Sequence, residues 1–313
     1  MKIVVPDAYV GPSPVVDGAE VVHVPAKAAV PDEHLDAEVL VAWGQPGWVL
    51  ADAAARMPRL RLVQGLMAGP DLVLGAGFAD DVALCSGVGG HDGTVTQHAL
   101  GLTLALVRNF PLAFQRMQER RWDGSLGGAM RDRAHDGRIT GLDGARVAVW
   151  GFGSIAATLS PVLTALGAEV TGIARTAGER HGYPVVAEDD IAELLAATDV
   201  LIMILPGNES TRHALNAERL AQLAPGALLV NVGRGITVDQ EALEAALRSG
   251  RLAGAAIDVT EPEPLPSDSP LWDLPTLFIT PHVAGGRPQH ADRLIADNVA
   301  ALEAGTPLRN RLR

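Results

Sequence analysis

The ten residues from Val147 to Ala156, Val-Ala-Val-Trp-Gly-Phe-Gly-Ser-Ile-Ala, constrain the fold of this chain more than any other stretch. The apolar run at 147–150 is typical of a parallel β-strand that is buried on both faces. It leads directly into Gly-Phe-Gly-Ser-Ile-Ala at 151–156, which fits the G-x-G-x-x-G/A dinucleotide fingerprint. Gly151 permits the tight turn, and Gly153 lets the backbone approach a pyrophosphate.

The residues after the fingerprint strengthen this interpretation, because glycines also end strands for structural reasons alone. Ser154 and Ile155 begin a predicted helix whose N-terminal N–H groups and dipole favour phosphate. Apolar residues recur every four positions from Ile155 onward, as in a helix, and 169–173 reads as the next parallel strand. Pro161 is expected to kink this helix.

The length and composition exclude several classes of protein. A chain of 313 residues is long enough for two domains, and its net charge of −12 argues against a polyanionic partner. The single cysteine, Cys85, excludes an internal disulfide, fits a reducing compartment and lies in an apolar run typical of a buried thiol. The N-terminus reads as a strand and not as a signal peptide, and no apolar run is long enough for a membrane span. We therefore expect a cytoplasmic protein, and no metal-ligand cluster is evident.

The second half of the chain alternates regularly between strands and helices. This rhythm predicts a doubly wound, parallel dinucleotide-binding domain. The clearest helices are expected at Asp190–Ala196 and Asp239–Arg248, and a last amphipathic helix at Gln289–Ala304. The predicted strands of this domain are 146–150, 169–173, 199–204, 227–231, 254–258 and 277–280.

The first hundred residues show a similar alternation, with a helix around Ala51–Arg56, and predict a smaller parallel α/β domain. A long helical region at Gly93–Met117 is expected to bridge two bodies, with a bend or break at Pro111. Residues 121–136 read as a polar surface loop. The predicted strands of the first domain are Lys2–Val5, Val21–Val24, Val39–Trp43, Arg61–Val63 and Val82–Cys85.

Three stretches just beyond predicted strand ends carry chemically useful side chains, at 231–235, 258–264 and 280–285. Open α/β sheets bind their ligands at this edge. The stretches contribute an arginine, which can hold a carboxylate and polarise a carbonyl, a histidine suited to proton transfer, and carboxylates that favour the charged histidine. Each alone has a structural reading, as a surface ion pair or a structural histidine. Together they predict reduction of a 2-oxo acid.

These segments resemble the D-isomer-specific 2-hydroxyacid dehydrogenases, a family that includes glyoxylate/hydroxypyruvate reductases and phosphoglycerate dehydrogenases. The resemblance runs from about residue 62 to residue 285. It implies that Arg234 binds the substrate carboxylate and carbonyl, that His282 is the acid/base, and that Glu263 is the partner of His282. It is strongest in the fingerprint and in 229–235, 254–259, 261–264 and 280–282.

The resemblance also implies two Rossmann-like domains with the active site in the cleft between them. The substrate domain would be flavodoxin-like and discontinuous, comprising 1–98 and 286–313, and the NAD(P)-binding domain would comprise 99–285. A homodimer through the nucleotide-binding domain is implied, with Thr94–Leu106 contributing. The expected cofactor contacts are Gly151, Gly153, Ser154, Ile155, position 205 in Leu205-Pro206, Val232, Gly233 and Asp258.

Residues 66–71 occupy the place of the family's loop whose backbone N–H groups hold the substrate carboxylate. Ala68 and Gly69 are the expected donors, because Pro70 has no N–H group. Met67 and Pro70 depart from the family's usual loop sequence. Gln97 stands where the family commonly has Glu, and packing between domains is its structural reading.

The choice of cofactor depends on the end of the second strand of the nucleotide-binding domain. NAD-specific domains have Asp or Glu there, whereas this chain has Ala174, followed by Arg175 and Thr176. A guanidinium and a hydroxyl are suited to a 2′-phosphate. We therefore expect NADP(H) to be preferred over NAD(H). The alternative is that Arg175 is only solvated and both cofactors are accepted.

The predicted reaction is hydride transfer from NADPH to a small 2-oxo acid, such as glyoxylate or hydroxypyruvate, giving the D-2-hydroxy acid. Formate dehydrogenases on this scaffold pair the histidine with Gln, so Glu263 argues against them. Phosphite dehydrogenases keep the Arg, Glu and His set and stay open as an alternative. A non-catalytic NADP(H)-sensing protein similar to the corepressors of this fold is the alternative from another class.

Overall fold

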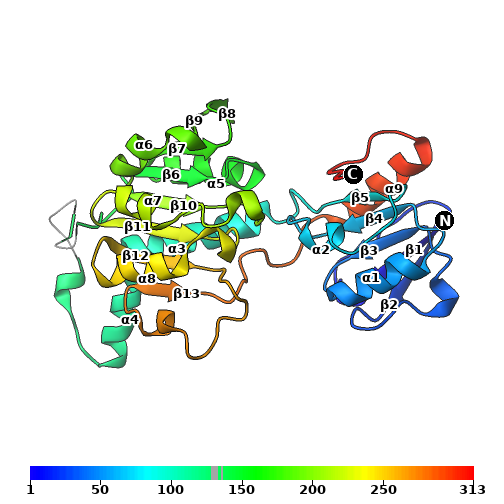
Figure 1. Cartoon of the computed structure of the whole chain (residues 1–313), viewed down its shortest axis with the longest axis horizontal. Helices are drawn as coiled ribbons and strands as arrows, with labels where there is room; N and C mark the ends of the chain where they lie inside the picture. The colour runs from blue at the N-terminus through cyan, green and yellow to red at the C-terminus, as the bar shows by residue number, and fades with distance from the viewer. Residues whose placement is uncertain (128–132, 135–136) are drawn as a thin grey trace. The chain divides into compact units, whose positions relative to one another are not determined.

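The computed structural model describes residues 1–127, 133–134 and 137–313, and the chain divides into two compact units (Figure 1). The first unit comprises Met1–His91 and Arg287–Arg313, and the second comprises Asp92–Gly286. The predicted surface loop at 121–136 falls partly on 128–132 and 135–136, which lie outside the described residues. Among the described residues, no helix has both the length and the apolar character of a membrane span.

The first unit contains a five-stranded parallel sheet in the order β2-β1-β3-β4-β5, which is the flavodoxin-like order. All five predicted strands are confirmed within a few residues. The strands are β1 Lys2–Pro6, β2 Glu20–Val24, β3 Val39–Ala42, β4 Leu62–Gly65 and β5 Ala83–Cys85. The helices are η1 Asp32–His34, α1 Gly47–Arg56, α2 Asp71–Leu74 and α9 Ala291–Ala304.

Both faces of this sheet are covered because alternate strand residues point to opposite sides and most of them are apolar. Leu40 and Val63 pack with α1 and α2 on one face, whereas Val39 and Leu62 pack with α9 on the other. The C-terminal helix is therefore part of the first unit. Asn298 of α9 is buried and donates from Nδ2 to the side-chain oxygen of Gln64 at 2.6 Å, which anchors the helix to β4.

The second unit contains an eight-stranded sheet in the order β13-β12-β11-β10-β6-β7-β9-β8. Six of its strands correspond to the six predicted ones, but the predicted number was wrong. β9 pairs in parallel with β7 and completes the doubly wound order 3-2-1-4-5-6, and β8 pairs antiparallel with β9. The strands are β6 Arg146–Trp150, β7 Glu169–Ala174, β8 Gly178–Arg180, β9 Tyr183–Ala187, β10 Val200–Met203, β11 Ala227–Asn231, β12 Leu252–Ile257 and β13 Leu277–Ile279.

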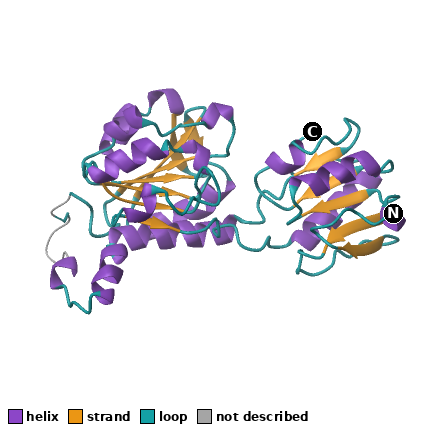
Figure 2. Ribbon diagram, turned by 60° about the horizontal axis from the view of Figure 1, so that its bottom comes forward, coloured by secondary structure: helices purple, strands orange, loops and turns teal. Residues whose placement is uncertain are grey.

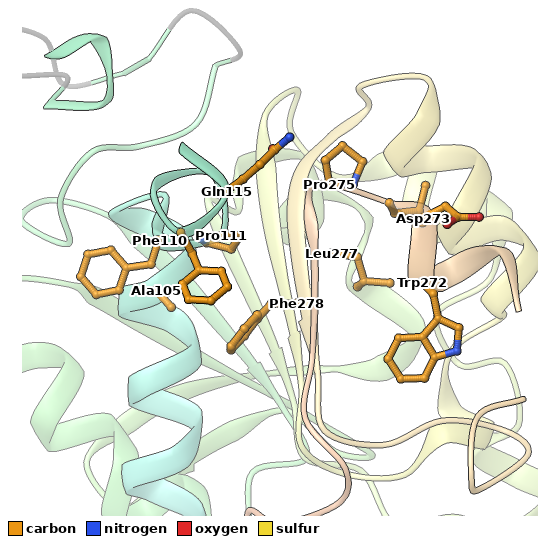
Figure 3. A pocket seen from close by; sticks show the side chains of 11 residues that line it. Ala105, Phe110, Pro111, Gln115, Trp272, Asp273, Pro275, Leu277 and Phe278 are labelled. Carbon is orange, nitrogen blue, oxygen red and sulfur yellow. The ribbon is translucent and has the colours of Figure 1, made fainter. Parts of the chain in front are cut away.

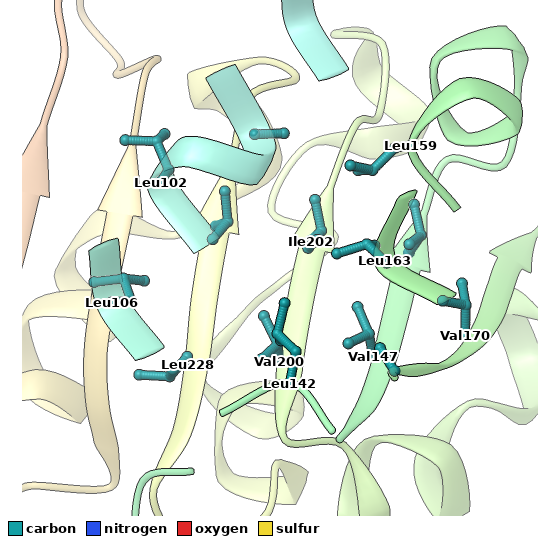
Figure 4. Packing of buried hydrophobic residues seen from close by; sticks show 14 of the residues in the cluster. Leu102, Leu106, Leu142, Val147, Leu159, Leu163, Val170, Val200, Ile202 and Leu228 are labelled. Atoms are coloured by element: carbon teal, nitrogen blue, oxygen red, sulfur yellow. The ribbon is translucent and has the colours of Figure 1, made fainter. Parts of the chain in front are cut away.

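Helices cover both faces of this sheet, as Figure 2 shows. On one face, α3 and α5 pack onto alternate residues of the central strands (Figure 4). On the other face, α6, α7 and α8 cover the remaining alternate residues. The helices are α3 Asp92–Val107, α4 Phe110–Gln118, η2 Gly124–Gly127, α5 Ser154–Ala165, η3 Glu188–Asp190, α6 Ala192–Ala197, η4 Glu209–Thr211, α7 Ala217–Gln222, η5 Gly235–Thr237, α8 Gln240–Arg248 and η6 Pro270–Asp273.

One helix prediction needs correction. The region predicted as a bridge is two helices of the second unit, because the chain turns at Asn109, whose φ is +53°, and Pro111 lies in the first turn of α4. The predicted break at Pro111 is thus confirmed. Proline has no N–H group, but in the first turn of a helix this removes no intrahelical hydrogen bond. α5 continues through Pro161 as one helix from Ser154 to Ala165, and the kink expected there stays a prediction. Pro161 lies in the second half of α5, where it removes a single intrahelical bond.

Candidate active site

The loop after β6 has the form that a dinucleotide pyrophosphate needs. Gly151 has a φ of +99°, and a Cβ there would lie 2.7 Å from the carbonyl oxygen of Ile204, so only glycine fits. A Cβ at Gly153 would meet no heavy atom within 4 Å, and its φ is −104°. The packing of the protein therefore does not require glycine at 153, but a side chain would fill the space in front of the helix. The residues present fit the pyrophosphate of a nicotinamide cofactor.

The start of α5 supplies donors to the same space. Its first intrahelical bond runs from Ala157 N to Gly153 O at 2.9 Å, so the N–H groups of 154–156 precede the hydrogen-bonded ladder. The hydroxyl of Ser154 donates to Asp92 Oδ1 at 3.1 Å, which leaves its backbone N–H as the group suited to phosphate. Ile155 is partly buried and packs against the core, so its contribution is also a backbone one.

The end of β7 carries exposed polar side chains, as expected for a cofactor-selecting segment. Arg175 and Thr176 are both exposed. The hydroxyl of Thr176 accepts a hydrogen bond from Nη2 of Arg180 at 2.7 Å. Sequence reasoning missed Arg180 because it also missed the hairpin that carries it. The His181-Gly182 pair was the available signal, since such residues tolerate the positive φ of a tight turn.

The loop after β11 holds Arg234 through backbone contacts. Gly233 N donates to the side-chain oxygen of Asn231 at 3.0 Å, and the Asn231 amide donates back to Arg234 O at 3.2 Å. Arg234 is half-buried, and its Nη1 donates to Gly233 O at 2.8 Å. Val232 is buried, and Gly233 packs against the backbone of Leu205. Position 205 is thus a buried leucine, with the proline at the next position.

His282 and Glu263 form a direct pair. His282 Nδ1 lies 2.7 Å from Glu263 Oε2, and the two side chains are 38% and 37% exposed. The other carboxylate oxygen, Oε1, accepts the backbone N–H of Thr260 at 3.0 Å, so the Glu263 carboxylate is fixed at both oxygens. Because the carboxylate engages Nδ1, the Nε2 atom of His282 remains for a substrate.

The loop that carries Glu263 is fixed by neighbouring polar groups. Arg212 Nη1 lies 3.2 Å from each carboxylate oxygen of Glu261, and Gln240 bonds to both the N–H and the carbonyl of Glu261. Hydrogen bonds to Glu209 and then to Glu261 raise the pKa of the Arg212 guanidinium above its ordinary value. These contacts limit where Glu263 can lie.

Asp258 organises the loop that carries His282. Its Oδ1 accepts the hydroxyl of Thr280 at 2.6 Å and Val283 N at 3.0 Å, and its Oδ2 accepts Ala284 N at 2.9 Å. Its backbone carbonyl accepts His282 N at 2.7 Å. His282 has a φ of +53°, an uncommon conformation for a residue with a side chain. The buried carboxylate thus fixes the side chain of Thr280 and the backbone that follows His282, and the backbone carbonyl of Asp258 holds the backbone of His282.

A histidine of α3 extends this network. His98 Nε2 lies 2.9 Å from Thr280 Oγ1 and 3.3 Å from Asp258 Oδ1. The Asp258 side chain is 0% exposed, so in this structure it contacts the protein alone. Sequence reasoning named Asp258 as a cofactor contact and missed His98 and Thr280. No local pattern links the three residues, which come from α3 and from two loops that follow neighbouring strands.

A cavity of about 590 Å³ opens beside the His282–Glu263 pair. Thr260, Leu265 and Trp272 also line it. It lies entirely within the second unit and gives the pair access to solvent and to small molecules.

The predicted substrate loop lies in the first unit, between β4 and α2. Met67 O accepts Gly87 N at 2.7 Å, which fixes the start of the loop. Among the described residues, the N–H groups of Ala68 and Gly69 have no acceptor, and their role as donors to a substrate stays a prediction. Pro70 precedes α2 as its N-cap residue. Cys85 is buried, and burial raises the pKa of its thiol to about 11, which confirms a structural thiol.

Comparisons with known proteins identify the family of this chain. The model of the D-isomer specific 2-hydroxyacid dehydrogenase NAD binding domain matches residues 100–284. An (S)-sulfolactate dehydrogenase from Chromohalobacter salexigens is 34% identical over 251 residues, 78% of each chain. A glyoxylate/hydroxypyruvate reductase A from Serratia proteamaculans is 32% identical over 288 residues, 89% of this chain and 87% of the relative.

A solved structure is similar over nearly the whole chain. The D-isomer specific 2-hydroxyacid dehydrogenase from Xanthobacter autotrophicus Py2, in complex with NADPH and MES, is 31% identical and superposes with a TM-score of 0.78. The similarity covers 95% of this chain and 90% of that one. Since the family model spans more than half of the chain and two relatives above 30% identity span more than two thirds, the chain belongs to the D-isomer specific 2-hydroxyacid dehydrogenases, a family of NAD(P)-dependent oxidoreductases that act on CH–OH groups.

Proposed function

We propose that the protein reduces a small 2-oxo acid of the glyoxylate or hydroxypyruvate type to the D-2-hydroxy acid with NADPH. The observation that carries the proposal is the His282–Glu263 pair, 2.7 Å apart, in the same unit as Arg234 and a fingerprint loop that fits a pyrophosphate. The loops of Arg234 and Glu263 adjoin each other, because Gly235 packs directly against the backbone of Thr260.

Each residue has a distinct role in this proposal. The bound cofactor supplies the hydride that reduces C2 of the substrate. Arg234 binds the substrate carboxylate and polarises the carbonyl through its guanidinium. His282 donates a proton from Nε2 to the carbonyl oxygen, while Glu263 at Nδ1 favours the protonated ring and fixes its orientation. The N–H groups of Ala68 and Gly69 are the proposed additional donors to the carboxylate.

The two units would divide this work. The second would bind the cofactor, with the pyrophosphate at 151–156 and a 2′-phosphate near Arg175 and Thr176, so that NADP(H) is preferred and NAD(H) remains possible. The NADPH complex of the Xanthobacter relative supports this preference. The first unit would be the substrate domain. Its contact-defined bounds, 1–91 and 287–313, are close to the predicted 1–98 and 286–313. Val232, Gly233, position 205 and Asp258 stay predicted cofactor contacts.

The test is turnover of purified protein with NADPH and, in parallel, NADH. The substrates are glyoxylate, hydroxypyruvate, pyruvate, phenylpyruvate and 3-sulfopyruvate, the last because one relative is a sulfolactate dehydrogenase. We expect reduction of at least one of these with NADPH favoured. Reduction of the cofactor by phosphite would instead support the phosphite dehydrogenase alternative. NADPH binding without any turnover would support a sensor protein.

Two substitutions test the assigned roles. His282→Ala should lower kcat about 10²- to 10⁴-fold and leave the Kd for NADPH unchanged, because the residue moves a proton. Arg234→Ala should raise the KM for the oxo acid as well as lower kcat. His213→Ala is the matched control, since His213 is exposed and has a φ of +49°, close to that of His282. Near-normal turnover of His282→Ala would refute the mechanism.

We also propose a homodimer formed through the second unit. Large apolar side chains of Phe110, Phe114 and Trp272 are 59%, 61% and 52% exposed around a cavity of about 680 Å³ between α4, η6 and β13 (Figure 3). An exposed apolar surface of this kind is typical of an interface. Ala105, within the predicted contributor 94–106, lines the same cavity. Light scattering should give a dimer for the wild type and a monomer for Phe114→Glu. Val10→Glu, an exposed site of the first unit, is the control.

A further inference from the structure

We propose that Arg180, on the hairpin formed by β8 and β9, is a second determinant of NADP(H) binding. It would contact the 2′-phosphate beside Arg175 and fix the hydroxyl of Thr176 as a phosphate donor. The inference rests on the proposed function, because it assumes that a nicotinamide cofactor binds at the carboxyl edge of β6 and β7.

The hairpin gives Arg180 a defined direction. His181 and Gly182 form its two-residue turn with φ values of +54° and +82°, the positive values that a tight hairpin turn needs. Arg180 is opposite Tyr183 in the antiparallel ladder. Because strand side chains alternate between faces, Glu179 points away from the face that Arg180 occupies. The neighbouring carboxylate therefore does not neutralise this guanidinium.

The contact with Thr176 prepares a phosphate donor. Arg180 Nη2 donates to Thr176 Oγ1 at 2.7 Å and to Thr176 O at 3.3 Å. A hydroxyl oxygen that accepts from a guanidinium still has its own proton to donate. The remaining N–H groups of Arg180 have no acceptor within the part of the chain that the structure describes. Arginine with two free donor directions is suited to a phosphate.

The local charge supports an anionic ligand. Within the described ranges, neither Arg175 nor Arg180 has a carboxylate within 4 Å. Several other arginines of the chain pair with acids, although not every exposed arginine does. Examples of such pairs are Arg61–Glu303, Arg116–Glu119, Arg212–Glu261, Arg248–Glu244 and Arg309–Asp297. Two unneutralised cations, one next to Thr176 in the sequence and one bonded to its hydroxyl, give this segment a local positive charge suited to a phosphate dianion, in a chain of net charge −12.

Aromatic packing connects the hairpin to the fingerprint loop. The ring of Phe152, between the two fingerprint glycines, packs edge-on against Tyr183 with centroids 6.1 Å apart and lies 6.4 Å from the ring of His181. Tyr183 also bonds to Thr164 of α5, with 3.3 Å between the hydroxyl oxygens. Figure 1 shows β9 beside β7, with β8 next to it. The position of Arg180 is thus fixed relative to the loop that would bind the pyrophosphate.

The experiment measures binding, so that it does not depend on finding a substrate. Calorimetric Kd values for NADPH, NADH, adenosine 2′,5′-bisphosphate and AMP are compared for the wild type, Arg180→Ala, Arg175→Ala and Thr176→Val. We expect Arg180→Ala to raise the Kd values for NADPH and adenosine 2′,5′-bisphosphate, the two ligands with a 2′-phosphate, about 10- to 100-fold. This is the loss expected for a charged hydrogen bond. The Kd values for NADH and AMP should change by less than about twofold. Glu179→Ala, on the opposite face, is the control and should leave all four values unchanged.

A structural role for Arg180 predicts a different result. If Arg180 only fixed the hairpin, Arg180→Ala would weaken the binding of NADH and NADPH equally, and that outcome overturns the inference. An unchanged Kd for NADPH also overturns it. NADH binding also reports that the variant is folded. Non-additive losses in Arg180→Ala and Thr176→Val would support the shared contact with phosphate. A wild type that binds adenosine 2′,5′-bisphosphate but reduces no oxo acid would refute the proposed reaction and leave the assignment of Arg180 intact.

Discussion

Asp258→Asn tests whether one buried carboxylate supports both stability and the position of His282. Asparagine keeps the size of the side chain but turns one acceptor oxygen into a donor. In one orientation the new NH₂ faces the N–H of Ala284, now 2.9 Å from Oδ2. In the other it faces Val283 N and the hydroxyl of Thr280, 3.0 and 2.6 Å from Oδ1. Either way, at least one buried donor loses its acceptor.

The expected loss follows from these contacts. A buried donor without an acceptor costs about 1–3 kcal/mol, and converting the remaining charged bonds to neutral ones costs about 1 kcal/mol each. Removal of a buried charge offsets part of this. We therefore expect Asp258→Asn to lower the free energy of unfolding by about 3 kcal/mol. For a unit of this size the corresponding fall in Tm is about 6–12 °C.

The assay is calorimetric unfolding together with steady-state kinetics of the same samples. Asp239→Asn is the matched control, because Asp239 caps α8 by accepting Ala242 N at 3.1 Å and asparagine caps a helix equally well. The control should change stability by less than about 0.5 kcal/mol. We expect Asp258→Asn also to lower kcat, because the loop holding His282 loses a contact. A loss of stability no larger than that of the control would refute the reasoning.

Three further predictions address other parts of the chain. Burial raises the pKa of the Cys85 thiol from 9.0 to about 11. Its contribution to stability is therefore present below the unfolded pKa of 9.0 and is lost as the pH rises from there through the folded pKa of about 11. A thiol reagent at mildly alkaline pH should label only the unfolded protein, and rapid labelling of the folded protein would contradict this. Gly153→Val adds a side chain to open space, so the Tm should change little. The same side chain would occupy the space of the pyrophosphate, so the Kd for NADPH should rise at least about tenfold. Unchanged NADPH binding would count against the pyrophosphate site. Glu263→Gln keeps the hydrogen bond to His282 but removes the negative charge of the carboxylate. We expect kcat to fall about 10- to 100-fold while the Kd for NADPH is retained. A kcat equal to that of the wild type would show that this charge is not needed.

Much of the fold could be predicted because its signals are local. The buried parallel strands are continuous apolar runs, and the glycine at 151 marks a turn that no other residue fits. β8 and β9 were missed because they lie at the edge of the sheet, where only one residue of β9 is buried and β8 is polar. Arg180 was missed with them, although Arg175 and Thr176 were identified.

The predicted catalytic residues, Arg234, Glu263 and His282, could be chosen from their residue types and their order along the chain. The contacts that support them could not be predicted. Asp258 and Thr280 are 22 residues apart, and His98 is much farther away in the sequence. Their hydrogen bonds depend on the packing of α3 against β11 and β12, which no local pattern encodes. The sequence showed the place of Asp258 after a strand, but it did not show that its carboxylate bonds to Thr280 and to the backbone of 283 and 284.

The site separates the residue that reacts from the residue that supports it. The His282–Glu263 pair is more than a third exposed, so solvent screens its charges and it contributes little to folding. The backbone of His282 is in the left-handed region, which costs about 1–2 kcal/mol for a residue with a Cβ. Asp258 offsets that cost from a fully buried position, since it accepts bonds from three successive backbone N–H groups, those of 282, 283 and 284. Substitution of His282 should therefore remove activity at nearly constant stability, whereas substitution of Asp258 should reduce both together.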